Sequence, residues 1–492
     1  PLPTECRHWS TPDPEKSASA LWQEALASAA KLQVPDRRLQ RLYDLGVRTM
    51  VLLSAEDVVP GPYTYRRFWF RDACLMMNAL LGTGLDPLAK RQLNCFPAWQ
   101  RKDGYFHSQE GEWDSNGQVL WILDRFQQCT GEDLSDTWRE SVHRGADWIV
   151  RKRKQGKRPE GARGLLPAGF SAEHLGPNDY YFWDNLWSLK GLECAVRLAE
   201  QWGNPRRAEF WKTDLVSYQD VVWQSVETSK GFRQRSALPA APGRRMDAGA
   251  IGSMVADYPL QLTEPGDKRI RNTYEYLWEH CMVHGGFFQD MIHSGINAYL
   301  TLDLAQTLLR FGDSRYWDLV ESVAELASPT GNWPEAIHPG TRGGCMGDGQ
   351  HGWAAAEWTL MMRSLFIREE GEHLVLCPGI RKDWYGTGET LFFGPTLTPW
   401  GRLSIRVSPG EHHLRIDLEG KARSQPRSIR VAPPGCKPGE LSQIPDTVEL
   451  PWEDSGILRC SPTRTFLSWE GFPSPSNPLW KNRRSGEIPA WW

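Results

Sequence analysis

Two loops rich in Trp, Gly and Pro each carry a carboxylate that caps no predicted helix. One loop, residues 331–353, contains Glu335, and the other, residues 166–184, contains Glu173 with Asp179 as its near rival. A carboxyl among apolar and aromatic neighbours has a raised pKa, as an acid catalyst requires. Cleavage of a glycosidic bond needs one protonated acid and one carboxylate that activates water or attacks the sugar. The two loops therefore indicate general acid/base chemistry on a sugar.

Further polar and aromatic residues stand at predicted helix starts or in these loops. Arg71-Asp72 opens one predicted helix and offers paired donors and acceptors to sugar hydroxyls. Asp114 opens another, where a simple N-terminal cap explains it equally well, and Asp184 follows the second loop as a binding candidate. Flat rings beside charged residues suit the apolar faces of sugars. The candidates for that role, with a histidine beside them, are Trp69, Trp113, Trp183, Trp333, His351 and Trp353.

Twelve helices are needed to position these loops. Segments with helical periodicity cover 38–53, 70–81, 86–100, 115–129, 134–153, 183–201, 205–226, 248–262, 268–282, 295–311, 314–326 and 352–367. Short turns alternate with long loops rich in Trp, Gly, Asp and His, and almost no strand pattern lies between them. Six helical hairpins with their long loops on one face predict a mainly α protein with an (α/α)6 barrel.

The hydrophobic period changes after residue 370. Apolar residues alternate over 403–407 and again over 414–418, on either side of Pro409-Gly410. This pattern predicts a hairpin in a small C-terminal antiparallel β region. We therefore expect a lead-in segment over 1–35, the barrel over 36–370, a β-rich region over 371–460 and a Pro- and Trp-rich tail over 461–492.

Composition narrows the class of protein. The 492 residues carry a formal net charge of -3, which gives no support for a nucleic-acid partner, and no apolar run is long enough for a membrane span. The predicted chemistry needs no metal or organic cofactor. Four cysteines lie in helical patterns, namely Cys74, Cys95, Cys194 and Cys281. This placement predicts buried free thiols and hence a cytoplasmic protein. Because the chain begins at Pro1, a processed N-terminus would equally allow a secreted or periplasmic location.

Four short motifs give the sequence a family resemblance. In order, Phe70-Arg71-Asp72-Ala73, Asp114-Ser115-Asn116-Gly117, Met246-Asp247-Ala248-Gly249 and Trp333-Pro334-Glu335 resemble motifs of six-hairpin glycosidases. The resemblance is to the glucoamylase family and related bacterial glycosidases, and it covers roughly residues 36 to 368.

The resemblance implies a role for each matching residue. In that family an acid after the fifth helix protonates the glycosidic oxygen, and a glutamate after the eleventh activates water with inversion. By position, Glu173 would be the acid and Glu335 the base. Arg71 and Asp72 would hold the non-reducing-end sugar.

The sequence departs from the glucoamylase pattern at the acid, where Ser171-Ala172-Glu173-His174-Leu175 replaces a Trp-Glu-Glu motif. The spacing from Glu173 to Asp179 is instead similar to the acid loop of inverting disaccharide phosphorylases, in which phosphate attacks and no base is needed. Because Glu335 stands in a base-like setting, we expect an inverting, exo-acting hydrolase of an α-glucoside or similar small glycoside. The alternatives are a phosphorylase, a non-catalytic carbohydrate-binding relative and, more distantly, a sugar epimerase that uses histidines.

Overall fold

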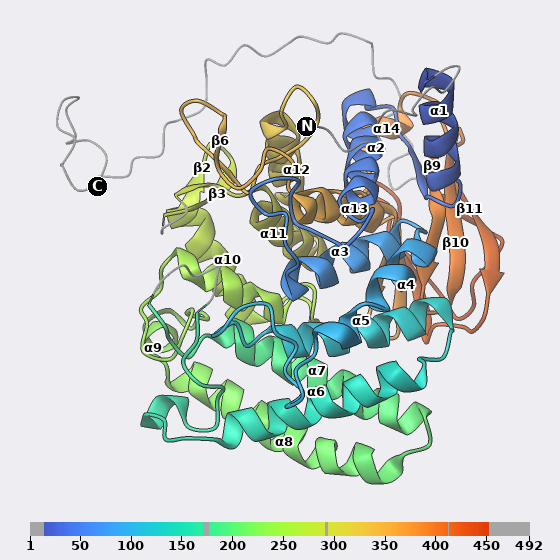
Figure 1. Ribbon diagram of the computed structural model, residues 1–492. Helices are drawn as coiled ribbons and strands as arrows, with labels where there is room; N and C mark the ends of the chain where they lie inside the picture. Colours follow the sequence, from blue (N-terminus) through green and yellow to red (C-terminus); the bar gives the residue numbers. More distant parts are fainter. Residues whose placement is uncertain (1–13, 171–176, 291–293, 412, 452–492) are drawn as a thin grey trace, which may run out of the picture. The chain divides into compact units, whose positions relative to one another are not determined.

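The computed structural model describes residues 14–170, 177–290, 294–411 and 413–451, so the proposed acid Glu173 and the tail over 461–492 lie outside the described residues. Most of the described chain between residues 37 and 366 is helical, and most of it beyond residue 366 is strand (Figure 1). None of the described helices is both long and apolar enough to cross a membrane.

An inner ring of six elements forms the centre of the helical part. Each packs on the next, and the last returns to the first. In ring order these are α3 (Phe70–Gly82), α5 (Ser115–Thr130), α7 (Phe182–Gln201), η4 (Ala248–Ala256), α11 (Ala298–Phe311) and α13 (Gly352–Phe366). Because neighbours surround them, nearly all residues of α3 and every residue of α13 are buried. We call the end where these elements begin the mouth and the end where they finish the base.

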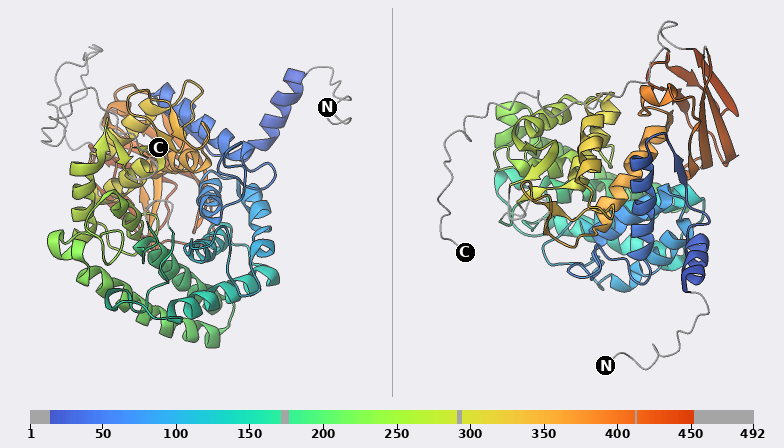
Figure 2. Two further views of the ribbon diagram at one scale, coloured as in Figure 1. Left: turned by 60° about the vertical axis from the view of Figure 1, so that its left-hand side comes forward. Right: turned by 90° about the horizontal axis from the view of Figure 1, so that it is seen from above.

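Six outer helices cover this ring. They are α2 (Arg37–Leu52), α4 (Asp86–Leu93), α6 (Asp136–Lys154), α8 (Pro205–Thr228), α10 (Lys268–Cys281) and α12 (Tyr316–Leu326), and each packs on one or two inner elements. Outer helices are amphipathic, with one buried stripe, and several start at a capping side chain, as at Asp36, Ser135 and Asp267. The predicted (α/α)6 barrel is therefore confirmed, and its two layers can be followed in Figure 2.

Some predicted helix bounds were wrong. The segment after Asp247 forms the 3-10 helix η4, whose sequence contains Gly249 and Gly252, rather than an α-helix as far as residue 262. The third helix ends at Leu93 and is followed by the short η2 (Phe96–Trp99). The helix expected from residue 295 begins at Ala298, because the side chain of Asn297 accepts a hydrogen bond from Leu300 N–H and caps it.

The expectation of almost no strands within the barrel sequence was also wrong. Five strands form one sheet at this part of the chain, in the order β2 (Met282–Val283), β3 (Gly286–Gln289), β4 (Gly295–Ile296), β5 (Ala336–Ile337) and β6 (Gly344–Met346). We call this sheet the mouth sheet, because β5 directly follows Glu335. Each strand has two to four residues, which is too short to give a period-2 pattern.

Two further sheets make up the C-terminal region. One has the order β1-β9-β10-β11-β14 and the other β13-β12-β8-β7. Their strands are β7 (Ile367–Glu370), β8 (His373–Leu376), β9 (Leu391–Thr398), β10 (Gly401–Pro409), β11 (His413–Ala422), β12 (Ser428–Val431), β13 (Gly439–Leu441) and β14 (Thr447–Pro451). The predicted hairpin is formed by β10 and β11, and the residue pair nearest its turn is Pro409 with Leu414.

The C-terminal region differs from expectation in two ways. The pair β12 and β8 is parallel, so the region is not wholly antiparallel. The lead-in segment contains α1 (Pro14–Ala25) and β1 (Lys31–Gln33), and β1 pairs with β9. The remaining short helices are η3 (Glu160–Ala162), α9 (Lys230–Arg235) and α14 (Lys382–Tyr385). Of the cysteines predicted to be buried, Cys74, Cys194 and Cys281 are buried and Cys95 is exposed.

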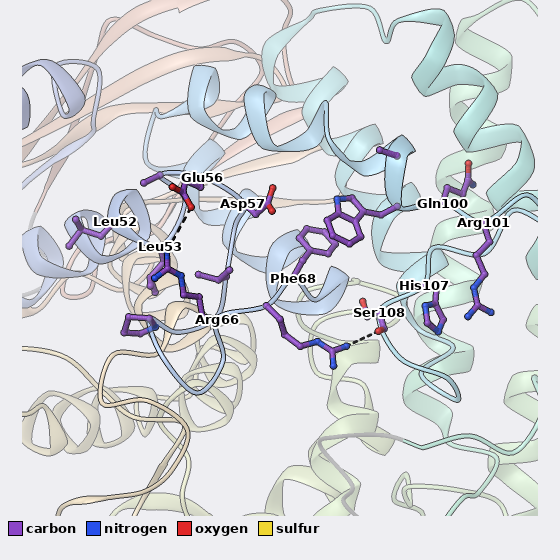
Figure 3. A pocket seen from close by; sticks show the side chains of 16 residues that line it. Leu52, Leu53, Glu56, Asp57, Arg66, Phe68, Gln100, Arg101, His107 and Ser108 are labelled. Carbon is purple, nitrogen blue, oxygen red and sulfur yellow. Dashed lines mark hydrogen bonds and ion pairs between the residues drawn. The ribbon is translucent and has the colours of Figure 1, made fainter. Parts of the chain in front are cut away.

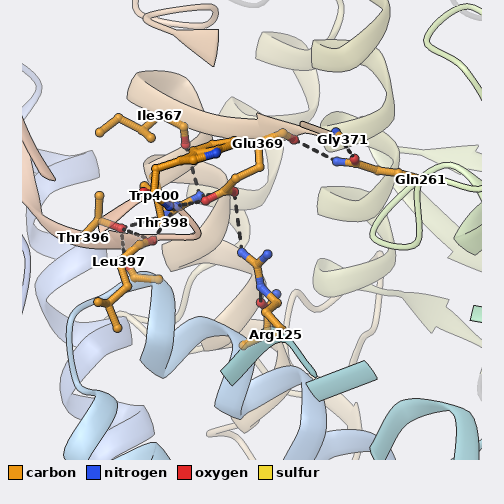
Figure 4. Close-up of polar contacts among 12 residues, drawn as sticks. Arg125, Gln261, Ile367, Glu369, Gly371, Thr396, Leu397, Thr398 and Trp400 are labelled. Carbon is orange, nitrogen blue, oxygen red and sulfur yellow. Dashed lines mark hydrogen bonds and ion pairs between the residues drawn. The ribbon is translucent and has the colours of Figure 1, made fainter. Parts of the chain in front are cut away.

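Buried charges join the base of the barrel to the β region (Figure 4). Arg363 of α13 donates to Glu369 of β7 at 2.6 Å, to Thr396 Oγ1 at 2.8 Å and to the carbonyl of Leu397 at 2.9 Å. Although burial opposes ionisation, Arg363 and Arg125 lower the pKa of Glu369 to about 2. The carboxylate is therefore charged and fully engaged in holding these elements together.

Candidate active site

Glu335 lies at the mouth immediately before β5, and it is only 9% exposed. The preceding Trp333 anchors the strand: its indole N–H donates to the carbonyl of Val323 at 2.8 Å, and its own carbonyl accepts from His351 N–H at 2.9 Å. Its ring packs on Trp358, with centroids 5.3 Å apart. Trp333 is 1% exposed, so the structure places it in the core beneath the site and not on a sugar-binding surface.

A tyrosine hydroxyl holds the Glu335 carboxylate. Tyr65 donates its O–H to Glu335 Oε2, and burial, followed by the negative charge of Glu335, raises the pKa of Tyr65. Gly347 packs against both residues with a φ of 69°, and a Cβ there would stand 3.0 Å from Glu335 Cβ and 3.0 Å from the Tyr65 ring. Only glycine suits this position, because it combines a left-handed conformation with no space for a side chain.

Asp348 fixes the loop that presents Tyr65. Its carboxylate accepts the backbone N–H groups of Tyr63, Thr64 and Tyr65 at 2.9 to 3.1 Å. Although burial acts to raise it, these hydrogen bonds lower the pKa of Asp348. Sequence reasoning missed Tyr65 and Asp348. Tyr65 and Glu335 are 270 residues apart, and neither a motif nor a helix start marks the tyrosine.

Asp72 stands beside this pair in the first turn of α3. Burial, together with the charges of Glu335 and Glu112 and against the effect of Arg71, raises the pKa of Asp72 to about 7. His351 Nε2 lies 3.8 Å from Asp72 Oδ1, and burial lowers the pKa of His351 to about 3. Near neutral pH, His351 is therefore uncharged, and Asp72 can act as either donor or acceptor towards a hydroxyl group.

Arg71 is held rigidly by carboxylates from α5 and the loop before it. Its Nε donates to Asp114 Oδ2 at 2.7 Å, and its Nη1 lies 3.7 Å from Glu112 Oε1. The indole N–H of Trp183 donates to the same Asp114 oxygen at 2.7 Å. Asp114 makes no side-chain capping hydrogen bond, so its role is to orient Arg71 and not to start the helix.

Buried aromatic rings pack together beneath the mouth, where Trp183, Tyr299 and Trp353 are each 3% exposed. Trp353 stacks on Tyr299 with centroids 4.0 Å apart, and Tyr299 stacks on His351 at 5.3 Å. Trp183 lies 6.4 Å from Trp353, which joins the rings of α7, α11 and α13. Trp69 is half-buried and meets Tyr65 edge-on at 5.7 Å. The structure thus brings predicted residues Trp69 and His351 against Tyr65, which holds Glu335, and it packs Trp353 on Tyr299.

Two predicted binding residues are buried inside the barrel wall. Trp113 is 5% exposed, packs on Tyr105 and Trp148, and donates its indole N–H to the carbonyl of Ala168 at 3.4 Å. It therefore supports the loop that leads to residue 173. Asp184 is 1% exposed in the first turn of α7. Their positions favour a supporting role over direct contact with a ligand.

The loop predicted to carry the acid is described only at its two ends. Gly169 N–H donates to the carbonyl of Asp179 at 2.9 Å, and Asp179 N–H donates to the carbonyl of Gly169 at 3.1 Å. These two hydrogen bonds join the described ends of the loop. Asp179 Oδ2 lies 3.2 Å from Arg244 Nε, and Arg244 Nη1 lies 3.7 Å from Asp247. This contact joins the described end of the loop to Arg244. Glu173 itself lies between these ends, outside the described residues.

Within the described ranges, no group of three or more His, Cys, Asp and Glu side chains could hold a metal ion. The site is instead a set of close carboxylates, one neutral histidine, one arginine and aromatic rings. Such a set can bind hydroxyl groups and transfer protons.

Comparisons with known proteins support the fold. The chain matches no protein-family model and no curated protein. Solved structures with a similar fold include a sialidase, with a TM-score of 0.60 and 13% identity, over 82% of this chain and 41% of that one. They also include the α-L-rhamnosidase from Aspergillus terreus, with a TM-score of 0.57 and 14% identity, over 86% of this chain and 50% of that one. A bacterial glucoamylase complexed with acarbose has a TM-score of 0.53 and 14% identity, over 71% and 58% of the two chains.

This chain thus spans 41 to 58% of the length of those three relatives. At such identities the similarity is one of fold. The fold of this protein is that of the six-hairpin glycosidases, as the sequence motifs predicted.

Proposed function

We propose that this protein is a glycoside hydrolase that inverts the anomeric centre, with Glu335 as the general base. The observation that carries the proposal is the position of Glu335: its carboxylate is buried at the barrel mouth, held by the Tyr65 hydroxyl and adjacent to Asp72. The solved structures with this fold include chains named glucoamylase and rhamnosidase.

In the proposed reaction, Glu335 accepts a proton from water as the water oxygen bonds to the anomeric carbon. The bond from that carbon to the glycosidic oxygen breaks, and the acid gives its proton to the departing oxygen. The products are an alcohol and a sugar of inverted configuration, and the proton on Glu335 returns through solvent to the acid. Tyr65 orients the base by its hydrogen bond to Oε2.

Glu173 is the proposed acid, because it lies on the loop whose ends are closed by Gly169 and Asp179. Asp179, which lies 3.2 Å from Arg244, is the alternative. The loop leads into α7. Trp183 of α7 donates a hydrogen bond to Asp114 at the same mouth as Glu335.

The remaining mouth residues would bind the terminal sugar. Arg71 donates hydrogen bonds from a rigid position, and Asp72 can share a hydrogen bond with a hydroxyl in either protonation state. The half-buried Trp69 offers a face to an apolar side of the ring. The proposed substrate is therefore a small glycoside or the non-reducing end of a glycan, with an α-glucoside as the first candidate.

The test is a glycoside panel assayed with Glu335→Gln. We expect wild-type hydrolysis of an aryl α-glucoside, an aryl α-L-rhamnoside or an α-linked disaccharide without added phosphate. Loss of the base should reduce kcat by about 10²- to 10⁴-fold. The matched control is Glu325→Gln, an exposed glutamate of α12, which should keep full activity.

Three results would contradict the proposal. Full activity of Glu335→Gln would exclude the residue as base. Turnover only with added inorganic phosphate would indicate a phosphorylase. Binding of sugars without turnover of any substrate would indicate a non-catalytic relative.

A further inference from the structure

A groove of about 790 Å³ lies outside the loop that carries Tyr65 and Trp69 (Figure 3). It is lined by the end of α2, by parts of the segments 55–62 and 66–68, by the end of η2, and by Gln100, Arg101, His107 and Ser108. Its volume is within the range of about 300–1,000 Å³ that is typical of ligand pockets. None of the residues placed in the candidate active site lines it, so the groove is a separate feature of the mouth.

The groove contains an exposed tryptophan with a rigid support. Trp99 is 44% exposed, and one face of its ring stacks on Phe68 with centroids 5.2 Å apart and an interplanar angle of 12°. Phe68 in turn meets the buried rings of Phe70 at 4.8 Å and Phe96 at 5.6 Å. Because Trp99 is fixed from below, its exposure does not come from a loose side chain. A large aromatic face held open inside a groove marks a binding surface.

The rim of the groove is polar but mixed in charge. Glu56 and Arg66 lie 3.8 Å apart with side chains 87% and 68% exposed, so each remains available to a ligand. Asp57, Arg101 and His107 add further hydrogen-bond donors and acceptors, and their charges are of both signs. Burial and the charge of Arg101 lower the pKa of His107, which favours its neutral form. A rim of this kind suits a ligand that is neutral and rich in hydroxyl groups.

Arg67, which lines the groove, also contacts a residue of the candidate active site. The guanidinium of Arg67 lies 4.1 Å above the ring of Trp69, and the same group donates to the carbonyl of Ser108 at 2.8 Å. Phe68 lines the groove, and the next residue, Trp69, contacts Tyr65 of the candidate site. A chain molecule bound at the mouth therefore has a second surface directly beyond the loop.

We infer that this groove binds a neutral oligosaccharide segment of the substrate, remote from the bond that is cleaved, with Trp99 stacked on a sugar ring. The identity of the ligand as a glycan rests on the proposed function. The apolar face of a pyranose carries C–H groups that pack on the electron-rich face of an indole. The polar rim would take the ring hydroxyls. The substrate is then a glycan longer than a disaccharide.

Native gels containing a polysaccharide test the groove without requiring turnover. The probes are the neutral polymers amylopectin, galactomannan and xyloglucan in separate gels, and wild type should be retarded by one of them. Trp99→Ala should weaken that binding about tenfold or more, since tryptophan anchors dominate binding surfaces. Trp99→Tyr should retain most of it. The matched control is Phe210→Ala, which removes a 52% exposed ring from α8 and should bind as wild type does.

Kinetics separate this proposal from the proposed function. With a short aryl glycoside, Trp99→Ala should have wild-type kcat and KM, whereas with the retarding polysaccharide its KM should rise about tenfold. The proposed glycan binding is contradicted if none of the three polymers retards wild type. It is also contradicted if Trp99→Ala is retarded as strongly as wild type. If retardation depends on Trp99 while Glu335→Gln loses no activity, glycan binding at the groove is supported and the assignment of Glu335 as general base is contradicted.

Discussion

The two ends of the barrel treat buried carboxylates in opposite ways. At the base, Glu369 is surrounded by Arg363 and Arg125, which lower its pKa to about 2 despite burial. At the mouth, burial and the neighbouring Glu335 and Glu112 raise the pKa of Asp72 to about 7 in spite of Arg71. Both carboxylates are largely removed from water, so their partners decide the difference. At the base of the barrel, charged groups hold α13 and the β region together. At the mouth, several carboxylates lie close together, which lowers the stability of the fold.

That cost in stability supports the proposed site at the mouth. A fold selected only for stability would not place Asp72 and Glu335 within electrostatic range of each other in a buried setting. The base, by contrast, joins α13 to β7 and β9 by hydrogen bonds from a single arginine. Variants at the two ends should therefore have opposite profiles, with stability changed at the base and activity changed at the mouth.

The largest effect on stability is expected at the base. Arg363→Met removes an arginine that is 2% exposed and leaves Glu369 buried with one partner fewer. Breaking a buried ion pair costs about 3–5 kcal/mol of unfolding free energy. Chemical denaturation should measure it. The control is Arg415→Met, which breaks the exposed pair with Asp417 and should cost at most about 1 kcal/mol. Equal losses in both variants would remove the distinction between base and surface.

A smaller effect is expected when the mouth loses one hydroxyl. Tyr65→Phe keeps the ring against Trp69 but removes the hydrogen bond to Glu335. Hydrogen bonds to charged groups contribute about 1.5–3 kcal/mol, so kcat/KM should fall about 10- to 100-fold. Tyr63→Phe is the control, because that ring is 86% exposed on the same loop. Wild-type kinetics in Tyr65→Phe would show that the hydroxyl does not orient the base.

A third effect is a pH-dependent change in stability at the mouth. The folded-state pKa of Asp72, about 7, exceeds its ordinary value of 3.8, so its ionisation destabilises the fold as pH rises from about 4 to 7. Asp72→Asn removes that penalty. The variant should match wild type at pH 4 and melt at a higher temperature at pH 8, while its activity falls. A constant difference in melting temperature across this range would contradict the raised pKa.

Glu369 should have the reverse dependence. Its folded-state pKa of about 2 lies below the ordinary 4.5, so it stabilises the fold above pH 4.5, and this contribution is lost as pH falls towards 2. The melting temperature of Glu369→Gln should therefore approach that of wild type only at the acidic end. A deficit that persists unchanged at pH 2 would mean that packing, and not charge, dominates at this residue.

Much of the barrel could be predicted from the sequence, because long helices repeat their apolar positions over many turns. The bounds of α3, α5 and α13 fall within one residue of expectation. The mouth sheet could not be predicted, since its strands are too short for a pattern and are paired through tertiary contacts. The 3-10 geometry of η4 likewise depends on packing between α7 and α11.

Part of the candidate site could also be located from the sequence. Helix starts and aromatic loops pointed to Arg71, Asp72, Asp114 and Glu335, whose types and positions are visible in the sequence. Side-chain direction was not visible, so Trp333 and Trp113 were expected at the surface but lie in the core. Tyr65 escaped notice because its place is set by backbone hydrogen bonds to the distant Asp348.

The most direct test of Glu335 as a water-activating base is the configuration of the first-formed product. Proton NMR can follow the anomeric signal during rapid hydrolysis of an aryl α-glycoside, before mutarotation. We predict that wild type releases the β-anomer first and that Glu335→Gln releases no product on the same timescale. Initial release of the α-anomer would mean retention, which requires carboxyls only about 5–5.5 Å apart and a covalent intermediate. That result would contradict the assignment of Glu335 as a general base.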